Sequence, residues 1–219
     1  MQNHIDLIVK NIGVLATPEG QGPLKGDAQG KIKLIENAYI AIRGDKIADL
    51  GTQEELKNLH ISDNTKIIDA QGRLVTPGLV DPHTHLIFAG WRQKELSYKL
   101  KGMGYLDILS MGGGILSTVR NTRKASLEEL VEKGVKSLNR MMALGITTCE
   151  VKSGYGLSTQ EELKQLQVTR SLGAIQPIEL VSTFMGAHAI PAEYKENREG
   201  YLALLCDEML PAVWESELA

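Results

Sequence analysis

The feature that most restricts the fold of this chain is an alternation of strand and helix patterns after residue 75. Residues 126–145, SLEELVEKGVKSLNRMMALG, place leucine, valine and methionine at helical spacing. Ser126 and Glu129 form a capping-box pair at the start of this helix. The β-branched run ITTCEV follows as a strand, and LSTQEELKQLQVTRSLG repeats the helix pattern, with Ser158 and Glu161 as its expected box. IELVSTFMGAH is the next strand, so the order predicts parallel strands joined by right-handed crossovers.

Glycines mark the expected ends of both helices. Gly145 follows the last apolar position of the first helix, and Gly173 has the same place in the second. NREGYLALLCDEMLPAV has the composition of a further helix. We interpret the leucines and methionines on these helices as core residues rather than as a cofactor site.

The first third of the chain has a different character. IDLIVKNI is a strand pattern, and KIKLIENAYIAIRGDKIADLG predicts a hairpin that turns at Gly44 and Asp45. TKIIDAQGRLVTPG turns at Gln71 and Gly72, whereas TPEGQGPLKGDAQG is a predicted loop. We therefore predict a small β-sandwich unit over residues 1–75, without chemistry of its own, followed by an α/β unit over residues 76–219.

Composition argues against several classes of function. The 219 residues are 42% hydrophobic and 23% charged, with a formal net charge of -3 and no long charged run. This balance argues against a nucleic-acid partner or a membrane surface. The N-terminus lacks a signal-peptide pattern, and no apolar run approaches the roughly 18 residues that span a bilayer. Cys149 and Cys206 are far apart, which fits core positions in a reducing cytosol better than ligands or a disulfide, so we expect a cytoplasmic protein.

Two of the five histidines stand one residue apart in VDPHTHLIFAG, just after an apolar run. Side chains at positions i and i+2 of an extended segment point to the same face, so His83 and His85 should face one way together. Two neutral imidazoles on one face are a start toward a metal site. The alternative is a pair of hydrogen-bonded polar residues at a strand end.

Polar residues follow three of the predicted strands. His83 and His85 follow the first, KSGYG (residues 152–156) follows ITTCEV, and His188 follows IELVSTFMGA. Parallel α/β barrels carry their chemistry at the C-terminal ends of the strands, because the loops after the strands converge there. Three such strand ends favour a metal-dependent enzyme over isolated polar residues.

Several motifs together resemble a known family. VTPGLVDPHTH resembles the first barrel strand of the amidohydrolase superfamily, in which an HxH pair binds the catalytic metal. HLIFAGWRQKE, GGGILSTVRNTR, EVKSGYGL and FMGAHAIPAEY resemble the imidazolonepropionase family within it, in order from about Ile5 to the C-terminus. EVKSGYGL and GAHAIP are far more specific than HxH, which marks only the superfamily.

The resemblance implies a role for five residues. It implies that His83 and His85 are metal ligands and that Arg92 contacts the substrate, where a guanidinium can hold a propionate carboxylate. It implies that Tyr155 hydrogen-bonds the ring and that His188 contacts the substrate. Without the resemblance, Arg92 would be a surface ion-pair partner, and His188 equally a third metal ligand or a core histidine.

The resemblance also implies a reaction, the hydrolysis of 4-imidazolone-5-propanoate to N-formimidoyl-L-glutamate in histidine degradation. One Zn²⁺ or Fe³⁺ would lower the pKa of a bound water. The family uses a single metal, so Lys152 is not expected to be a ligand. The implied partners are the small-molecule substrate and a second copy of the chain in a homodimer.

The chain departs from the family in its length. A whole (β/α)8 barrel takes about 250 residues, and the residues after 75 have room for roughly four of its eight strands. We therefore expect the first half of a TIM-like barrel, an incomplete amidohydrolase fold without the general base and the remaining ligands. Three interpretations stay open. The chain is a piece of this hydrolase, or it is a catalytically incompetent fragment or assembly partner, or it belongs to a related amidohydrolase that acts on another cyclic amide.

Overall fold

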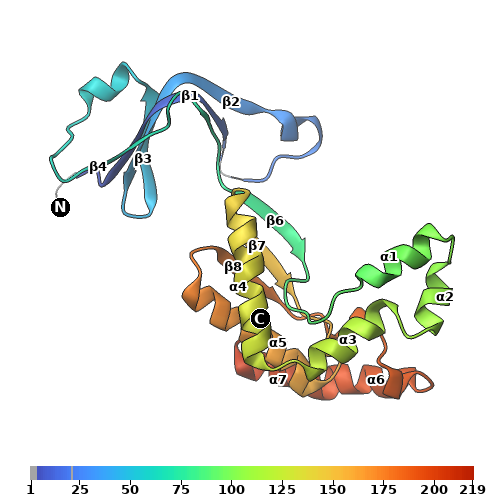
Figure 1. Cartoon of the computed structure of the whole chain (residues 1–219). Helices are drawn as coiled ribbons and strands as arrows, with labels where there is room; N and C mark the ends of the chain where they lie inside the picture. Colours follow the sequence, from blue (N-terminus) through green and yellow to red (C-terminus); the bar gives the residue numbers. More distant parts are fainter. Residues whose placement is uncertain (1–3, 21) are drawn as a thin grey trace. The chain divides into compact units, whose positions relative to one another are not determined.

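The computed structural model describes residues 4–20 and 22–219. The chain forms two compact units, one that ends at Pro77 and one that begins at Gly78 (Figure 1).

The first unit is built on one sheet. Its strands are β1 (Leu7–Pro18), β2 (Ile32–Arg43), β3 (Lys46–Thr52), β4 (Lys66–Asp69) and β5 (Leu74–Val75). Two short 3-10 helices cover Gly26–Gly30 and Glu55–Asn58. The strand order is β3-β2-β1-β4, with β5 also paired to β1. The antiparallel β2–β3 hairpin turns at Gly44 and Asp45, as the sequence predicts.

The prediction of a β-sandwich is wrong for the described residues, because all five strands of this unit belong to the same sheet. The reason lies in β1, which runs through a bulge between Val9 and Ile12. Its first half pairs with β4 and its second half with β5, both in parallel. Because the bulge lets β1 pair with β4 along one half and with β5 along the other, all five strands join in a single sheet, and no second sheet forms.

The second unit has a parallel sheet of three strands, β6 (Leu79–Thr84), β7 (Ile146–Lys152) and β8 (Glu179–Thr183), in the order β6-β7-β8. Its helices are α1 (Gln93–Leu100), α2 (Tyr105–Ser110), α3 (Gly114–Lys124), α4 (Leu127–Ala143), α5 (Thr159–Ile175), α6 (Arg198–Leu204) and α7 (Leu210–Ser216). The parallel strands and their helical crossovers confirm the predicted α/β class. The unit has three strands, whereas its length has room for roughly four, and residues 198–216 are helical, as the composition of NREGYLALLCDEMLPAV predicts.

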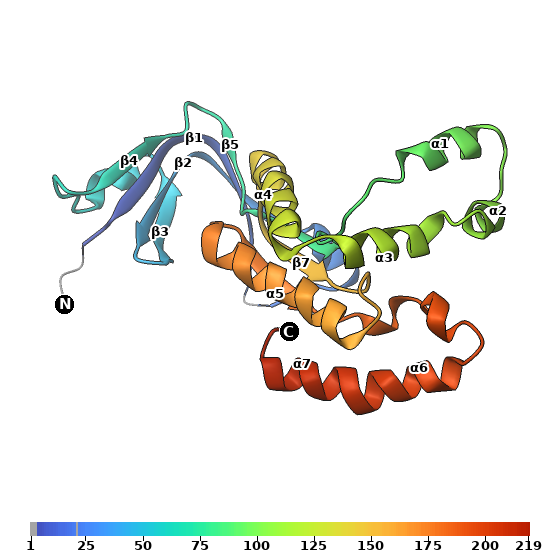
Figure 2. The same cartoon turned by 60° about the horizontal axis from the view of Figure 1, so that its bottom comes forward.

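Helices α4 and α5 lie side by side against one face of the sheet (Figure 2). Cys149 and Val151 of β7 are buried against leucine and valine side chains of both helices. Alternate residues of β7, such as Glu150, point to the other face. One face of the sheet is thus core, and the other carries polar groups.

The predicted ends of the long helices are partly right. Ser126 caps α4 with a complete capping box to Glu129, and Gly145 follows this helix with a φ of +88°. Helix α5 begins after Ser158 as expected, but the Ser158 side chain makes no capping hydrogen bond. Gly173 does not end α5, because the helix continues to Ile175.

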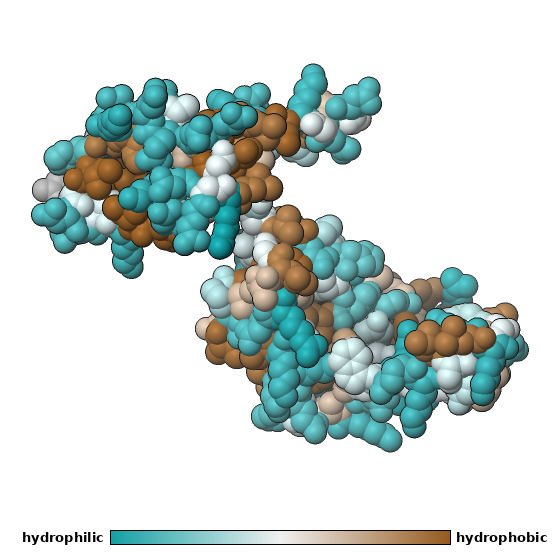
Figure 3. Space-filling model, turned by 45° about the horizontal axis from the view of Figure 1, so that its top comes forward, coloured by the Kyte–Doolittle hydropathy of each residue, from teal (hydrophilic) through white to brown (hydrophobic). Residues whose placement is uncertain are grey.

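Helices α1 and α2 project from the sheet as an arm that α3 connects back to the body (Figure 1). Apolar atoms lie at the surface of this arm (Figure 3), where Leu100 is 79% and Leu106 is 75% exposed. Helices α6 and α7 are joined by a π-helical turn at Leu205–Met209 and form nearly one rod (Figure 2). Among the described residues, none of the helices is long and apolar enough to cross a membrane.

Candidate functional site

The C-terminal ends of the three parallel strands bring together four of the residues that the sequence singles out. The rings of His85 and His188 stack with their centroids 4.5 Å apart. Tyr155 has its ring centroid 5.1 Å from that of His85 and 5.5 Å from that of His188. The ring of His83 lies 6.1 Å from that of His85. Residues from three separate strand ends therefore form one cluster.

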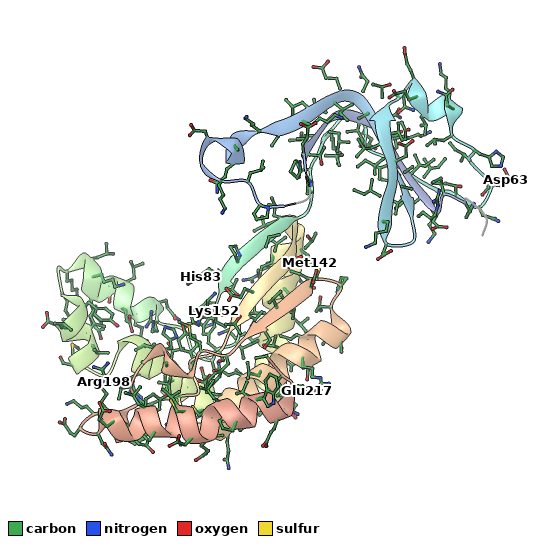
Figure 4. The ribbon with its side chains drawn as sticks, turned by 180° about the vertical axis from the view of Figure 1, so that it is seen from behind. Asp63, His83, Met142, Lys152, Arg198 and Glu217 are labelled. Carbon is green, nitrogen blue, oxygen red and sulfur yellow. The ribbon has the colours of Figure 1, made fainter. Side chains whose placement is uncertain are left out.

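His83 and His85 come from β6 and the residue that follows it. Figure 4 shows His83 on β6 beside Lys152 at the end of β7. His83 is exposed, whereas His85 is half-buried. The pair thus lies at the margin of the polar face of the sheet, with the His83 imidazole exposed at the edge of the cluster and the His85 imidazole inside it.

The His85 ring has a fixed tautomer. Its Nδ1 lies 3.2 Å from the carbonyl oxygen of Ser153. A carbonyl can only accept, so Nδ1 must carry the proton, and Nε2 keeps its lone pair. Burial, together with the charge of His188, lowers the pKa of His85 to about 4. The ring is therefore neutral near pH 7, with a free nitrogen that can bind a metal.

His188 lies in a short 3-10 helix, Gly186–His188, after β8. Its Nδ1 is buried and has no hydrogen-bond partner among the described residues. Burial lowers the pKa of His188, and the carboxylate of Glu162 opposes that shift. A buried nitrogen without a hydrogen-bond partner costs free energy, so the ring keeps this position in spite of that cost.

The loop after β7 passes unusually close to His188. Gly154 has a φ of +105°, and a Cβ atom at this position would lie 2.8 Å from both Cβ and Nδ1 of His188. Only glycine allows this approach without a shift of the ring. The loop therefore determines where Tyr155, the next residue, presents its hydroxyl.

A cavity of about 240 Å³ opens beside the cluster, lined by Arg92, Tyr155 and His85 together with Phe88, Gly90, Trp91 and Thr118. Burial raises the pKa of Tyr155, whereas the positive charge of Arg92 lowers it. The phenol therefore stays protonated near pH 7 and can donate a hydrogen bond. The structure thus combines a cation, a phenol and one imidazole around one opening, with the His188 ring stacked on that imidazole.

The Arg92 side chain is 44% exposed, and its Nε lies 3.8 Å from the carboxylate of Glu95. This loose contact corresponds to the surface ion pair that the sequence left as the alternative for Arg92. An exposed pair of this kind contributes little to stability. Arg92 is therefore held only weakly and can turn toward the cavity that it lines.

Lys152 and Glu150 form an ion pair on the polar face of the sheet. The hydroxyl of Thr183 donates to Glu150 over 2.8 Å. Lys152 also lies 3.4 Å from the carbonyl oxygen of Pro82. The lysine therefore has polar partners of its own on this face.

The described residues contain no group of three or more histidine, cysteine, aspartate or glutamate side chains placed to hold a metal ion. His83 and His85 are a pair, and the His85 tautomer suits a ligand.

Comparison with known proteins agrees with the motifs. The model of the amidohydrolase family matches residues 66–104, which include the HxH pair. An imidazolonepropionase of Alkaliphilus metalliredigens is 54% identical over 98% of this chain and 51% of the relative's length. An imidazolonepropionase of Bacillus velezensis is 52% identical over 100% of this chain and 51% of its own length.

The chain resembles imidazolonepropionases over almost its whole length. The resemblance indicated by EVKSGYGL and GAHAIP is thereby confirmed. The chain spans about half the length of the curated imidazolonepropionases that it matches.

Solved structures show the same fold at lower identity. Guanine deaminase of E. coli has a TM-score of 0.55 and 18% identity, over 80% of this chain and 36% of the deaminase. Atrazine chlorohydrolase of Arthrobacter aurescens, complexed with zinc, has a TM-score of 0.53 and 19% identity, over 81% of this chain and 35% of that enzyme. The likeness to these enzymes supports an amidohydrolase fold.

The sequence analysis did not predict the buried polar residues that hydrogen-bond to the cluster and to the loop that carries Tyr155. Ser153 is buried, accepts from His85 through its carbonyl, and accepts the backbone N–H of Met185 through its hydroxyl. Glu162 and Gln165 of α5 are also buried. Ser153 lies within the motif KSGYG that the sequence singles out, whereas Glu162 and Gln165 lie on the following helix and nothing in the sequence marks them.

Proposed function

We propose that the whole protein is a metal-dependent hydrolase that opens the cyclic amide of 4-imidazolone-5-propanoate to give N-formimidoyl-L-glutamate in histidine degradation. One observation carries this proposal: His83, His85, Tyr155 and His188 converge from three strand ends, in a chain similar to imidazolonepropionases over 98% of its length.

We propose that residues 76–219 are the N-terminal half of an amidohydrolase (β/α)8 barrel, with residues 1–75 as the small β unit before it. Three parallel strands with α4 and α5 on one face support this assignment. The polar face of the sheet, which carries Glu150 and Lys152, would then line the barrel interior. A homodimer and a cytoplasmic location belong to the same proposal.

His83 and His85 would hold the metal, Zn²⁺ or Fe³⁺. Support comes from the fixed His85 tautomer, whose Nε2 is free, and from the low pKa that keeps this ring neutral. When bound, the metal lowers the pKa of a water molecule so that hydroxide is available near neutral pH. The residue that acts as general base is not assigned among the described residues.

Three residues would recognise the substrate. Arg92 would hold the propionate carboxylate through two parallel hydrogen bonds, because its loose contact with Glu95 is easily exchanged for the ligand. Tyr155 would donate its phenolic proton to the ring or to the opened product. His188 would contact the same ring from its stacked position on His85. These side chains would orient the ring amide so that its carbonyl carbon faces the attacking water, and the C–N bond would break as the ring nitrogen is protonated.

The test is turnover by the protein expressed from its complete reading frame, supplied with Zn²⁺ or iron. We expect loss of the imidazolone and formation of N-formimidoyl-L-glutamate, identified by mass spectrometry as the substrate plus one water. Other cyclic amides, such as a hydantoin and a dihydropyrimidine, serve as controls. Turnover of a control amide with none of the imidazolone would contradict the proposal and favour a related amidohydrolase.

The 219-residue chain assayed alone beside the complete protein separates the remaining interpretations. Activity of both would show that residues 1–219 suffice for turnover. Activity of the complete protein alone would make this chain a catalytically incompetent piece of the hydrolase.

A further inference from the structure

The loop that carries Tyr155 is bound along its backbone by one buried carboxylate. Glu162 of α5 has no exposed surface. Its Oε2 accepts the N–H of Gly154 over 2.9 Å. Its Oε1 accepts the N–H groups of Gly156 and Leu157 over 2.8 and 2.7 Å. A carboxylate with three such donors is well satisfied in spite of its burial.

Gln165, one helical turn further along α5, accepts the remaining N–H group of this loop. It is 1% exposed, and its Oε1 accepts the N–H of Tyr155 over 3.0 Å. Its Nε2 donates to the carbonyl oxygen of Ile87 over 2.7 Å. Two side chains of one helix thus accept four consecutive N–H groups, from Gly154 to Leu157. Gln165 also ties this loop to the segment that follows His85.

The opposite side of the same loop meets a cation. Arg123 of α3 donates from Nε to the carbonyl of Gly156 over 2.6 Å and from Nη2 to the carbonyl of Leu157 over 3.1 Å. The peptide group that joins Gly156 and Leu157 therefore lies between Glu162 and Arg123, with its N–H toward the carboxylate and its C=O toward the guanidinium, so that its dipole points the favourable way. This arrangement compensates the buried charge without a direct ion pair.

The loop needs such support because its backbone is unfavourable. Gly154 has a φ of +105° and Leu157 a φ of +54°, a conformation that a leucine rarely adopts. Strand β7 has already ended at Lys152, so no sheet partner takes these N–H groups. Without Glu162 and Gln165, four buried donors would have no acceptor.

We propose that Glu162 and Gln165 are positioning residues for the substrate site, which fix the Tyr155 ring against His85 and His188 by holding the backbone on both sides of it. Glu162 sets the turn of the loop. Gln165 sets its separation from the segment that leads to Arg92. The consequence for catalysis rests on the proposed function, whereas the backbone constraint does not.

Glu162→Gln tests the constraint with little change of shape. The amide can offer only one acceptor atom, and its NH₂ group would face one of the three N–H donors. Glu161→Gln is the matched control, one residue earlier on the same helix, where the carboxylate pairs with Lys164 instead. Gln165→Met removes the Tyr155 and Ile87 hydrogen bonds and serves as the second variant if Glu162→Gln folds poorly.

The first readout is hydrogen exchange of the loop amides, followed by NMR in the 219-residue chain without substrate. We expect exchange at residues 154–157 to be at least about tenfold faster in Glu162→Gln than in the control, while the amides of the β7–β8 ladder are unchanged. Equal exchange in Glu162→Gln, Gln165→Met and the control would overturn the constraint.

The second readout is kinetics in the complete protein. A positioning role predicts that kcat/KM falls about 10- to 100-fold in Glu162→Gln with metal content unchanged, and that the control keeps the wild-type value. Faster loop exchange with an unchanged kcat/KM would overturn the role in positioning. If the wild-type protein does not turn over the imidazolone, the proposed function fails, and hydrogen exchange still decides the constraint.

Discussion

Replacement of Gly154 by alanine should displace His188 and destabilise the second unit. The new Cβ would lie 2.8 Å from Cβ and Nδ1 of His188 and 2.9 Å from the carbonyl oxygen of Met185. The carbonyl belongs to the backbone and cannot move freely, so the ring and the loop must separate. The alanine must also take a φ near +105°, which L-residues rarely adopt.

Two terms contribute to the expected loss. The positive φ costs about 1–2 kcal/mol for a residue with a Cβ atom. Overpacking against a buried ring and a carbonyl costs typically about 1–3 kcal/mol. We therefore expect Gly154→Ala to lower the free energy of unfolding of this unit by about 2–5 kcal/mol. In the complete protein, the displaced His188 should lower kcat/KM as well.

Gly145→Ala separates the cost of the positive φ from the cost of overpacking. Gly145 has a φ of +88°, and among the described residues a Cβ added there would meet only Cδ1 of Leu79, at 3.9 Å, an ordinary contact. This variant should show the conformational cost alone, about 1–2 kcal/mol. Gly173→Ala, inside α5 and with nothing within 4 Å, should instead stabilise by about 0.5–1 kcal/mol.

The assay is denaturant unfolding followed by far-ultraviolet circular dichroism. Among the described residues, every α-helix from α1 to α7 lies in the second unit, so the helical signal follows that unit. A loss in Gly154→Ala no larger than in Gly145→Ala would refute the close approach of the loop to His188.

Three further predictions concern the cluster. Arg92→Ala should cost on the order of 2–5 kcal/mol in kcat/KM, mainly through KM, and leave metal content unchanged; an unchanged kcat/KM would make Arg92 a surface residue. Tyr155→Phe should lower kcat/KM about tenfold through the lost hydroxyl, and equal rates would exclude it as a donor. The pKa of His85 is near 6.5 in the unfolded chain and about 4 in the folded site. Between these two values the unfolded chain binds a proton that the folded chain does not, so the free energy of unfolding decreases as the pH falls from 6.5 to 4. The stability difference between wild type and His85→Gln should therefore shrink from pH 6.5 to pH 4, and a constant difference would contradict the shift.

The sequence predicts those elements that carry a complete local signal. Helix α4 has an apolar stripe, a capping box at Ser126 and a glycine after its end, and it forms as expected. Helices α1 and α2 were not predicted, because α1 buries no residue and α2 buries only Ile108. An arm that contributes so little to the core leaves no periodic stripe to detect.

The start of α5 shows how tertiary contacts override a local pattern. Ser158 and Glu161 match a capping box, but Glu161 pairs with Lys164. The next residue, Glu162, turns inward to the loop before the helix. The four N–H groups of that loop need acceptors, and the sequence gives no sign of this need. A glutamate and a glutamine on a helix are usually solvent-exposed, so Glu162 and Gln165 could not be recognised.

The proximity of His83 and His85 could be predicted because it is local. His83 and His85 need only an extended segment to come together, and the structure places their rings 6.1 Å apart. His188 stands far along the chain, and its contact with His85 depends on the β6-β7-β8 order. Cys206, expected in the core, is exposed, whereas Cys149 is buried. Helix α6 continues through a π-helical turn at this cysteine, which rotates the following residues relative to a regular helix.

We propose that His83 and His85 hold the metal on which turnover depends. The most direct measurement removes metal from the complete protein with a chelator, restores Zn²⁺ stepwise, and records bound metal and imidazolone turnover in the same samples. We predict that both rise together to one metal per chain in the wild type. His85→Ala, which loses the buried neutral imidazole, should gain neither. Turnover by the metal-free protein, or full metal occupancy in His85→Ala, would contradict the account.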